Sequence, residues 1–531
     1  MKLCGAKLVG CVCCALLAFT FGCAALQAEL RLPHVLSDHM VLQREAPIHI
    51  WGWAQPGEVV HVSLQRPGPD SGKPWTPSST ADKLGQWSVY LPAGPAGGPY
   101  DLQVQGTGSS VTLHDVMVGD LWIASGQSNM EMPLAGFGPT TPIKDSAKEI
   151  AAADHPELRL MVVPHTGSAY PQDDVNASWR RCTPATAKSF SAVAYFFGRE
   201  IAAKEHVTVG LIDTTWGGTP AEAWTSFDAF GSNPSLAPVW TQWSKFVRDE
   251  TVENAVIVSE KRDDDQRRAA GQQPLAHPWH PPNDAYRPAS LYNGMIAPFT
   301  PLSIRGVIWY QGETNSRIDR SVLYHELFRS MILDWRMHFA QGQFPFLFAQ
   351  ISSFRSSPQE AWGVLRDAQR RTLDVANTAM AVTLDVGQSD NVHPPDKQTV
   401  GYRLALAARA LAYGEPVSYT GPLFTRADVE GDHMRVSFQD RVAKLQCRGG
   451  GCTGFEIAGA DHKFVPAEAV IEGATVTVHS ASTGDPRYVR YAWPNAPDAN
   501  LQDSAGLPAS TFTSEQEIVD PAPRSTALTH D

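Results

Sequence analysis

Short apolar runs, interrupted by Pro and Gly clusters, fill the first part of the chain. The runs 48–53 (IHIWGW) and 59–64 (VVHVSL) have the two-residue period of half-buried strands. Evenly spaced strands over residues 29–115 predict an N-terminal β-sandwich domain of roughly 85 residues. Its role is either structural, packed on the next domain, or that of a carbohydrate-binding module. We favour the structural role because we identify no exposed aromatic stripe.

The pattern changes over residues 116–414, where apolar runs alternate with stretches of helical period. This alternation predicts α/β layers around a parallel sheet. The polar stretch 252–284 is interpreted as an insertion, either a solvated surface helix and loop or a lid. Short β runs return over 415–531 and predict a C-terminal β-rich region. The expected strands are 207–212, 304–310, 346–351 and 380–385, and the expected helices are 190–205, 321–339, 362–376 and 397–413.

The start of the chain has the pattern of an export signal. Lys2 and Lys7 precede the apolar stretch 8–21, and small residues follow, so residues 1–28 are interpreted as a signal peptide. A lipoprotein anchored at Cys23 is the alternative. No second run approaches the roughly 18 apolar residues that span a bilayer. We therefore expect an exported protein, periplasmic or secreted, with no membrane span.

Charge and cysteine content narrow the possible functions. The 531 residues carry a formal net charge of -12 and no basic run, which argues against nucleic acid and anionic membrane surfaces as partners. Beyond the leader, only Cys182, Cys447 and Cys452 remain, and their spacing to His residues does not suggest zinc. We expect no metal or cofactor. Cys447 and Cys452 flank a short glycine-rich loop, and an exported chain favours a local disulfide there.

The apolar run 121–126 stops at a glycine and presents Ser128. A short buried strand that ends in this way can hold a nucleophilic hydroxyl at the rim of a sheet, although a plain turn is the commoner meaning of such a pattern. Three later loops follow expected strands and would meet Ser128 at the same sheet edge. They contain Gly217 and Gly218, residues 311–315, and residues 390–393.

These loops supply the remaining parts of a serine hydrolase. In Asp390-x-x-His393, the carboxylate can orient the imidazole while its other nitrogen faces the nucleophile; the alternative is a capped turn with a structural His. Ser128 is then the nucleophile, His393 the base and Asp390 the orienting acid. The backbone N–H groups of Ser128 and of Gly217 or Gly218 can bind the oxyanion. A side-chain amide from Gln311 or Asn315 would complete the hole.

Four ordered blocks resemble those of the sialate O-acetylesterase family in the SGNH hydrolase superfamily. They are Gly126-Gln127-Ser128-Asn129-Met130, Trp216-Gly217-Gly218-Thr219-Pro220, Trp309-Tyr310-Gln311-Gly312-Glu313-x-Asn315 and Asp390-x-x-His393-Pro394. The resemblance covers most of the chain after residue 28. It implies a flavodoxin-like, three-layer α/β/α catalytic domain over 116–414 with appended β-sandwich regions, and metal-free removal of acetyl groups from sugar hydroxyls. The third block departs from the superfamily's usual Gly-x-Asn.

The resemblance leaves the substrate open. It suggests 9-O-acetylated sialic acid, but acetylated plant cell-wall polysaccharides such as xyloglucan or xylan fit equally. Gln127, Glu313, Arg317 and Arg366 are candidates for substrate contact, and either Arg could meet a sialate carboxylate or be structural. The sequence predicts no oligomeric state.

Three rival functions remain. A glycosidase would use Glu131 and Glu313, but that chemistry has no need of His393. A second rival is a secreted, non-catalytic carbohydrate-binding protein. The third is a metal enzyme using His277 and His280, which the surrounding prolines disfavour.

Overall fold

The computed structural model describes residues 30–66, 76–138, 141–275, 283–439 and 444–518. The expected leader with Cys23, and the residues His277 and His280, lie outside the described residues. No helix within these ranges is both long and apolar enough to cross a membrane.

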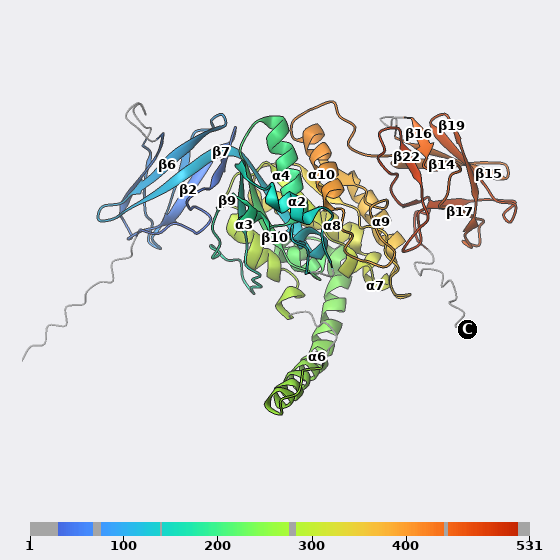
Figure 1. Ribbon diagram of the computed structural model, residues 1–531, viewed down its shortest axis with the longest axis horizontal. Coiled ribbons are helices and arrows are strands. Elements are labelled where there is room, and N and C mark those ends of the chain that lie inside the picture. Colours follow the sequence, from blue (N-terminus) through green and yellow to red (C-terminus); the bar gives the residue numbers. More distant parts are fainter. Residues whose placement is uncertain (1–29, 67–75, 139–140, 276–282, 440–443, 519–531) are drawn as a thin grey trace, which may run out of the picture.

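The N-terminal part forms two sheets (Figure 1). In one, β2 (Ile48–Trp53) pairs antiparallel with β5 (Gln86–Leu91). In the other, β3 (Val59–Gln65) pairs with β4 (Ser78–Thr80) and β6 (Gly97–Gln105). Alternate residues of β2 and β5 are buried, as the two-residue period predicts.

One long strand joins this part to the next. β7 (Ser110–Gly126) has 17 residues; its first part pairs antiparallel with β6 and its second part lies parallel to β10 (Val209–Thr215) and β11 (Gly306–Tyr310). β1 (Val41–Gln43) also pairs with it. The expected domain boundary at residue 115 therefore falls inside a continuous strand, so the N-terminal β region and the α/β region share a common backbone.

The central sheet has the order β13-β12-β11-β7-β10-β8-β9. All its neighbours are parallel except β8 and β9, so the predicted α/β fold with a parallel sheet is confirmed. After β7 the chain forms β8, β9 and β10 on one side and then crosses to form β11, β12 and β13 on the other. Ligands of such sheets bind where the chain crosses over. The outer strands are β8 (His155–Val162), β9 (Arg180–Cys182), β12 (Phe346–Ala349) and β13 (Thr378–Ala381).

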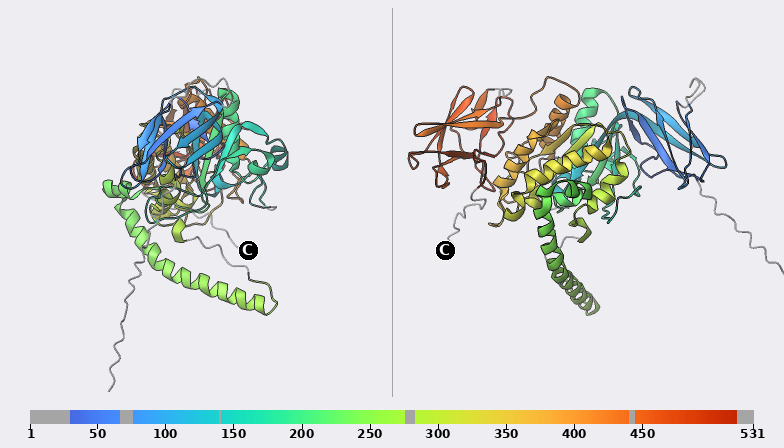
Figure 2. Two further views of the ribbon diagram at one scale, coloured as in Figure 1. Left: turned by 90° about the vertical axis from the view of Figure 1, so that its left-hand side faces the viewer. Right: turned by 180° about the vertical axis from the view of Figure 1, so that it is seen from behind.

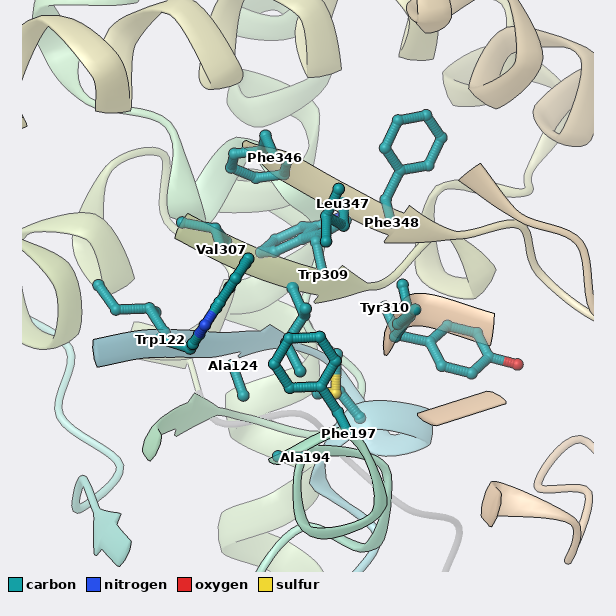
Figure 3. Close-up of a cluster of buried hydrophobic side chains, with 14 of the residues drawn as sticks. Trp122, Ala124, Ala194, Phe197, Val307, Trp309, Tyr310, Phe346, Leu347 and Phe348 are labelled. Atoms are coloured by element: carbon teal, nitrogen blue, oxygen red, sulfur yellow. The ribbon is translucent and has the colours of Figure 1, made fainter. Parts of the chain in front are cut away.

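Helices cover both faces of this sheet. On one face, α4 (Ala192–Glu205) and α10 (Lys397–Leu411) pack together, and the rings of Trp122 and Phe197 meet edge to face with centroids 5.0 Å apart. On the other, α8 (Tyr324–Phe339) sets Trp335 edge-on to Trp309 at 6.0 Å. Figure 3 shows the rings of Trp122, Phe197 and Trp309 gathered around β7 and β11, with those of Phe346 and Phe348 beside them on β12. The shorter helices are α1 (Ser128–Glu131), α2 (Ser146–Ala151), α3 (Pro184–Ala187), α5 (Phe227–Ser232), α7 (Ile318–Ser321) and α9 (Trp362–Arg371).

The expected insertion begins earlier than its polar sequence suggested. α6 (Ala237–Ala269) is a single helix of 33 residues that projects from the body of the molecule (Figures 1 and 2). A helix that is polar on most sides can extend into solvent in this way. The surface-helix interpretation fits this helix.

The C-terminal region is β-rich, as expected. One sheet has the order β14-β15-β20-β19, a second has β18-β17-β21-β23, and β16 pairs with β22. Their bounds are β14 (Phe424–Glu430), β15 (His433–Phe438), β16 (Leu445–Cys447), β17 (Phe455–Ala458), β18 (Val465–Pro466), β19 (Glu468–Glu472), β20 (Thr475–His479), β21 (Tyr488–Tyr491), β22 (Leu501–Asp503) and β23 (Phe512–Thr513).

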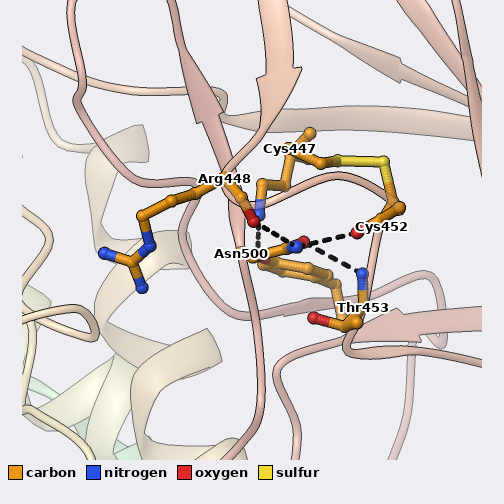
Figure 4. Close-up of a disulfide and its surroundings, with 8 residues drawn as sticks. Cys447, Arg448, Cys452, Thr453 and Asn500 are labelled. Atoms are coloured by element: carbon orange, nitrogen blue, oxygen red, sulfur yellow. Dashed lines mark hydrogen bonds between the residues drawn. A yellow bond between two sulfur atoms is a disulfide. The ribbon is translucent and has the colours of Figure 1, made fainter.

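The predicted disulfide between Cys447 and Cys452 is confirmed (Figure 4). The disulfide closes a loop, and Asn500 lies against this loop. Asn500 Nδ2 donates to the carbonyl oxygens of Arg448 at 2.9 Å and Gly451 at 2.8 Å. The loop is thus held by the disulfide and by the hydrogen bonds of the Asn500 side chain. Cys182 is buried with a free thiol.

Arg366 joins α9 to the C-terminal region. Its side chain is fully buried and donates to Thr511 Oγ1 at 2.9 Å and to the carbonyls of Ala492, Pro494 and Asn495 at 2.9, 2.6 and 3.2 Å. Burial lowers its pKa to about 9. Of the two roles left open for Arg366, substrate contact and structure, these bonds support the structural one, because the guanidinium has no exposed surface to offer a ligand.

Replacing Arg366 with Met should lower the free energy of unfolding by about 2 to 4 kcal/mol, since several buried carbonyls lose their donor. Urea unfolding followed by fluorescence measures the change. The matched control is Arg317→Met, because the Arg317 side chain is 63% exposed. It should change stability by less than about 0.5 kcal/mol. Equal effects of the two substitutions would contradict the structural role of Arg366.

Candidate active site

Ser128 stands where the central strand ends. Gly126 closes β7 with φ +135°, and a Cβ at this position would lie 2.2 Å from the Tyr310 carbonyl oxygen. Only glycine permits this close crossing of two strand ends. Gln127 then donates its N–H to the same carbonyl at 3.0 Å, and Ser128 begins α1. The sharp turn leaves the hydroxyl at the sheet edge.

His393 reaches Ser128 from a loop 265 residues away in sequence. Its Nε2 lies 2.8 Å from Ser128 Oγ. Burial lowers the pKa of His393 to about 4, and the positive charge of Lys397 acts in the same direction while Glu131 opposes it. The imidazole is therefore neutral near pH 7 and can accept the hydroxyl proton. The structure thus brings together two of the predicted catalytic residues.

Asp390 lies in the same loop but apart from the imidazole. Its side chain is exposed, and the hydrogen bonds within 283–439 include none between Asp390 and His393. The turn is closed by Asn391, whose N–H donates to the Gln388 carbonyl at 3.4 Å and whose Oδ1 accepts from the His393 N–H at 2.9 Å. The orienting role of Asp390 stays a prediction.

Gly217 lies against the nucleophile. A Cβ on Gly217 would be 3.3 Å from Ser128 Cβ and 2.8 Å from Glu131 Oε2, so a side chain here would enter the site. The Trp216 N–H donates to the Gly126 carbonyl at 3.0 Å and fixes the loop to the end of β7. Gly218 has φ +73° and lets the chain turn away. Of the two candidate glycines, Gly217 has its backbone beside Ser128.

The two predicted side-chain donors, Gln311 and Asn315, are buried in one network. Gln311 Nε2 donates to Asn315 Oδ1 at 2.6 Å and to the Thr219 carbonyl at 3.1 Å. Asn315 Nδ2 donates to Glu222 Oε2 at 2.8 Å, while its Oδ1 accepts from the Ala221 N–H at 2.9 Å. Both amides therefore brace the segment that follows Gly217 and Gly218. The oxyanion role predicted for them, and for the backbone N–H groups, stays a prediction.

A second buried network, not foreseen from the sequence, connects three of the loops. Lys397 Nζ donates to Asn129 Oδ1, and Asn129 Nδ2 donates to Glu313 Oε1 at 2.5 Å and to the Val392 carbonyl at 2.9 Å. Burial lowers the pKa of Lys397 to about 7 and raises that of Glu313. A single Lys at a helix start carries no sequence signal of burial, because its neighbours come from distant loops.

Glu131 and His165 form a more open group beside Gly217. His165 Nε2 lies 3.0 Å from Glu131 Oε1, and its ring stacks on Trp216 with centroids 4.5 Å apart and an angle of 5°. Glu131 thus pairs with His165, while Glu313 is buried and accepts a hydrogen bond from Asn129. The described residues hold no group of three His, Cys, Asp or Glu side chains suited to a metal ion.

Two further candidates for substrate contact differ in exposure. Gln127 is buried, and its Oε1 accepts from the N–H groups of Gly312 at 3.4 Å and Thr314 at 3.2 Å, so it braces the third loop. Arg317 is exposed and pairs with Asp319 at 3.3 Å. A hydroxyl, a neutral imidazole and adjacent backbone donors together suit acyl transfer.

Comparisons with known proteins agree with this chemistry. Residues 267–410 match the family model described as carbohydrate esterase, sialic acid-specific acetylesterase. The sialate O-acetylesterase of Rattus norvegicus is 31% identical, covering 91% of this chain and 94% of the relative. That of Homo sapiens is also 31% identical, covering 91% and 92%. The crystal structure of XAC1771, a carbohydrate acetylesterase from Xanthomonas citri, matches with a TM-score of 0.78 and 38% identity, covering 92% of this chain and 100% of that one.

These matches extend over nearly the whole chain and include the β regions on both sides of the central sheet. The protein is a carboxylic ester hydrolase that acts on acetylated carbohydrate. The chain belongs to the sialate O-acetylesterase family.

Proposed function

We propose that this protein removes acetyl groups from sugar hydroxyls with Ser128 as nucleophile and His393 as general base. The observation that carries the proposal is the 2.8 Å contact between Ser128 Oγ and His393 Nε2. The neutral state of His393 supports it, because only a neutral imidazole can take the proton.

Each step has a group in position. Ser128 Oγ attacks the acetyl carbonyl carbon while His393 Nε2 takes its proton; the oxyanion is met by the N–H groups of Ser128 and Gly217. The tetrahedral intermediate collapses, and His393 returns the proton to the departing sugar oxygen. Water then attacks the acetyl-Ser128 ester, gives its proton to His393, and acetate leaves as Ser128 regains its hydroxyl.

The proposal keeps Asp390 as the carboxylate that orients His393. Three-residue spacing across a turn allows this contact, and a rotation of the turn between Gln388 and Asn391 would be needed to make it. Glu131 is the competing carboxylate, because its charge acts on His393 in the conformation described.

Neutral glycans are the favoured substrate class over sialic acid. Of the two predicted Arg ligands, Arg366 is fully buried, and Arg317 is exposed and pairs on the surface with Asp319. Acetylated xyloglucan or xylan needs no cation in the site. The export signal proposed for residues 1–28 would bring the enzyme to the periplasm or outside the cell, where such polymers are met.

Ser128→Ala should lower kcat on acetylated xylan by about 10⁴-fold or more, since the nucleophile is lost. Acetate release from acetylated xylan, xyloglucan oligosaccharides and 9-O-acetylated sialic acid is measured beside the unaltered enzyme. Retained turnover would remove the mechanism, and absence of turnover in both proteins would favour a non-catalytic carbohydrate-binding role. A preference for the sialic acid would reverse the substrate assignment alone.

The kcat/KM profile reports the free enzyme, in which no Asp390 carboxylate contacts His393, so it should keep its value down to about pH 4, where His393 takes a proton. An unperturbed histidine titrates near pH 6.5, so kcat/KM should begin to fall at a more acidic pH than it would with such a histidine as base. Lys397→Met removes a charge that holds this pKa down, so the acidic limb should move to higher pH. Lys188→Met on the surface is the control. A limb near pH 6.5 in the unaltered enzyme would contradict the burial argument.

Asp390→Asn should reduce kcat by about 10²- to 10⁴-fold, because an imidazole without its orienting carboxylate loses alignment. Glu131→Gln is the matched comparison and should cost less. The readout is acetate release under single-turnover conditions, with unfolding midpoints as a check on folding. A nearly normal Asp390→Asn enzyme beside an inactive Glu131→Gln enzyme would transfer the orienting role to Glu131.

A further inference from the structure

A cavity of about 730 Å³ lies between the N-terminal β region and the α/β region. The outer face of the β2–β5 sheet forms one wall. Residues 171–173, the start of α5 and residues between 292 and 301 form the other wall. Neither Ser128 nor His393 is among the residues that line it, and the acetyl transfer described above makes no use of it.

The β2 wall is aromatic. Along this strand Ile48 and Ile50 are buried, so the alternate residues His49, Trp51 and Trp53 project from the opposite face and remain partly exposed. All three line the cavity. They form the aromatic stripe that we did not identify in the sequence, where the two-residue spacing of His49, Trp51 and Trp53 was its signal.

These rings are held in place before any ligand binds. His49 stacks on Trp51 with centroids 4.9 Å apart and on Tyr90 at 4.5 Å. His49 Nδ1 donates to the Pro301 carbonyl at 3.1 Å, which ties the stack to the α/β region, and burial lowers its pKa so that the ring stays neutral. The guanidinium of Arg31 covers the Trp53 ring at 4.0 Å. Rings fixed in this way lose little entropy on binding.

The opposite wall supplies polar groups and negative charge. Phe227, 47% exposed, adds a further ring, while Gln172 and Asn293 offer amides. Asp82, Asp173 and Asp228 line the cavity, His338 lies 3.4 Å from Asp228, and none of the described lining residues is Lys or Arg. Rings that stack on apolar sugar faces, beside amides and carboxylates that bind hydroxyls, suit an uncharged sugar. The three carboxylates outnumber the positive groups beside them, which are the Arg31 guanidinium over Trp53 and the His338 ring, so the local charge disfavours a sugar acid.

The cavity and the active site share one segment of chain. His165 pairs with Glu131 and stacks on Trp216 beside Gly217, and a few residues later Pro171, Gln172 and Asp173 line the cavity. The Gln172 N–H donates to the Asn293 carbonyl at 2.9 Å, which fixes this segment to residue 293 of the same wall. A long glycan held in the cavity would therefore contact a segment whose other end, at His165, borders Glu131 and Trp216.

We propose that this cavity is a second glycan-binding site, which takes a neutral β-linked oligosaccharide and holds a polymeric substrate while Ser128 removes its acetyl groups. The substrate class rests on the proposed function, but the binding step does not require a working ester site.

The test uses the full chain with Ser128→Ala, so that binding is measured without turnover. Xylohexaose and cellohexaose, which carry no acetyl groups, are titrated by calorimetry and by tryptophan fluorescence. Adding Trp51→Ala from one wall, or Phe227→Ala from the other, should weaken binding by about tenfold or more. Tyr402→Ala is the matched control, because Tyr402 is a 45% exposed ring on α10 that does not line the cavity. It should leave the affinity unchanged.

The unfolding midpoint of each variant shows whether the substitution has impaired folding. If one wall variant does not fold, the other still tests the proposal. The proposal is overturned if neither oligosaccharide binds. It is also overturned if the affinity is unchanged by the Trp51 substitution and by the Phe227 substitution. Trp51-dependent binding of N-acetylneuraminic acid in place of the neutral sugars would also overturn it. A turnover result that refutes Ser128 as nucleophile would leave these binding results intact, so the two failures are distinguishable.

Discussion

The structure depends on one strand that belongs to two sheets. β7 leaves the N-terminal β region, runs through the middle of the central sheet and ends at Gly126, where the Tyr310 carbonyl leaves no room for a side chain. Its neighbours β10 and β11 end at the same edge and deliver the loops of Gly217 and Gln311. The same continuous strand thus sets the turn to Ser128 and the position of the N-terminal β region. The cavity between that region and the α/β region shares segment 165–173 with the surroundings of the active site.

Around this turn, the active site is built on buried polar networks. Gln311 and Asn315 hold the segment after Gly217 and Gly218 from behind, while Asn129 joins the nucleophile's helix to Glu313, Val392 and Lys397. Buried amides and charges are costly unless fully paired, so such networks favour one arrangement of the loops. The same buried charge of Lys397 lowers the pKa of His393 and keeps the base neutral.

Much of this could be predicted from the sequence. Apolar runs located the strands, and the rule that parallel strand ends share an edge brought Ser128 and His393 together correctly. Burial could not be predicted in the same way: Arg366 is near an active-site loop in sequence, yet it packs against the C-terminal region. Likewise, the alternation that exposes Trp51 and Trp53 is visible in the sequence, but the cavity wall opposite them comes from residues far along the chain.

The central claim, that Ser128 carries the acetyl group during turnover, is tested most directly by trapping the intermediate. The enzyme is mixed with an aryl acetate, quenched in acid within the first turnover, digested and analysed by mass spectrometry. The account predicts one added acetyl group on the peptide that contains Ser128, and none in the His393→Ala protein. Acetyl transfer to a different residue, or a full burst of product with Ser128 unmodified throughout, would contradict it.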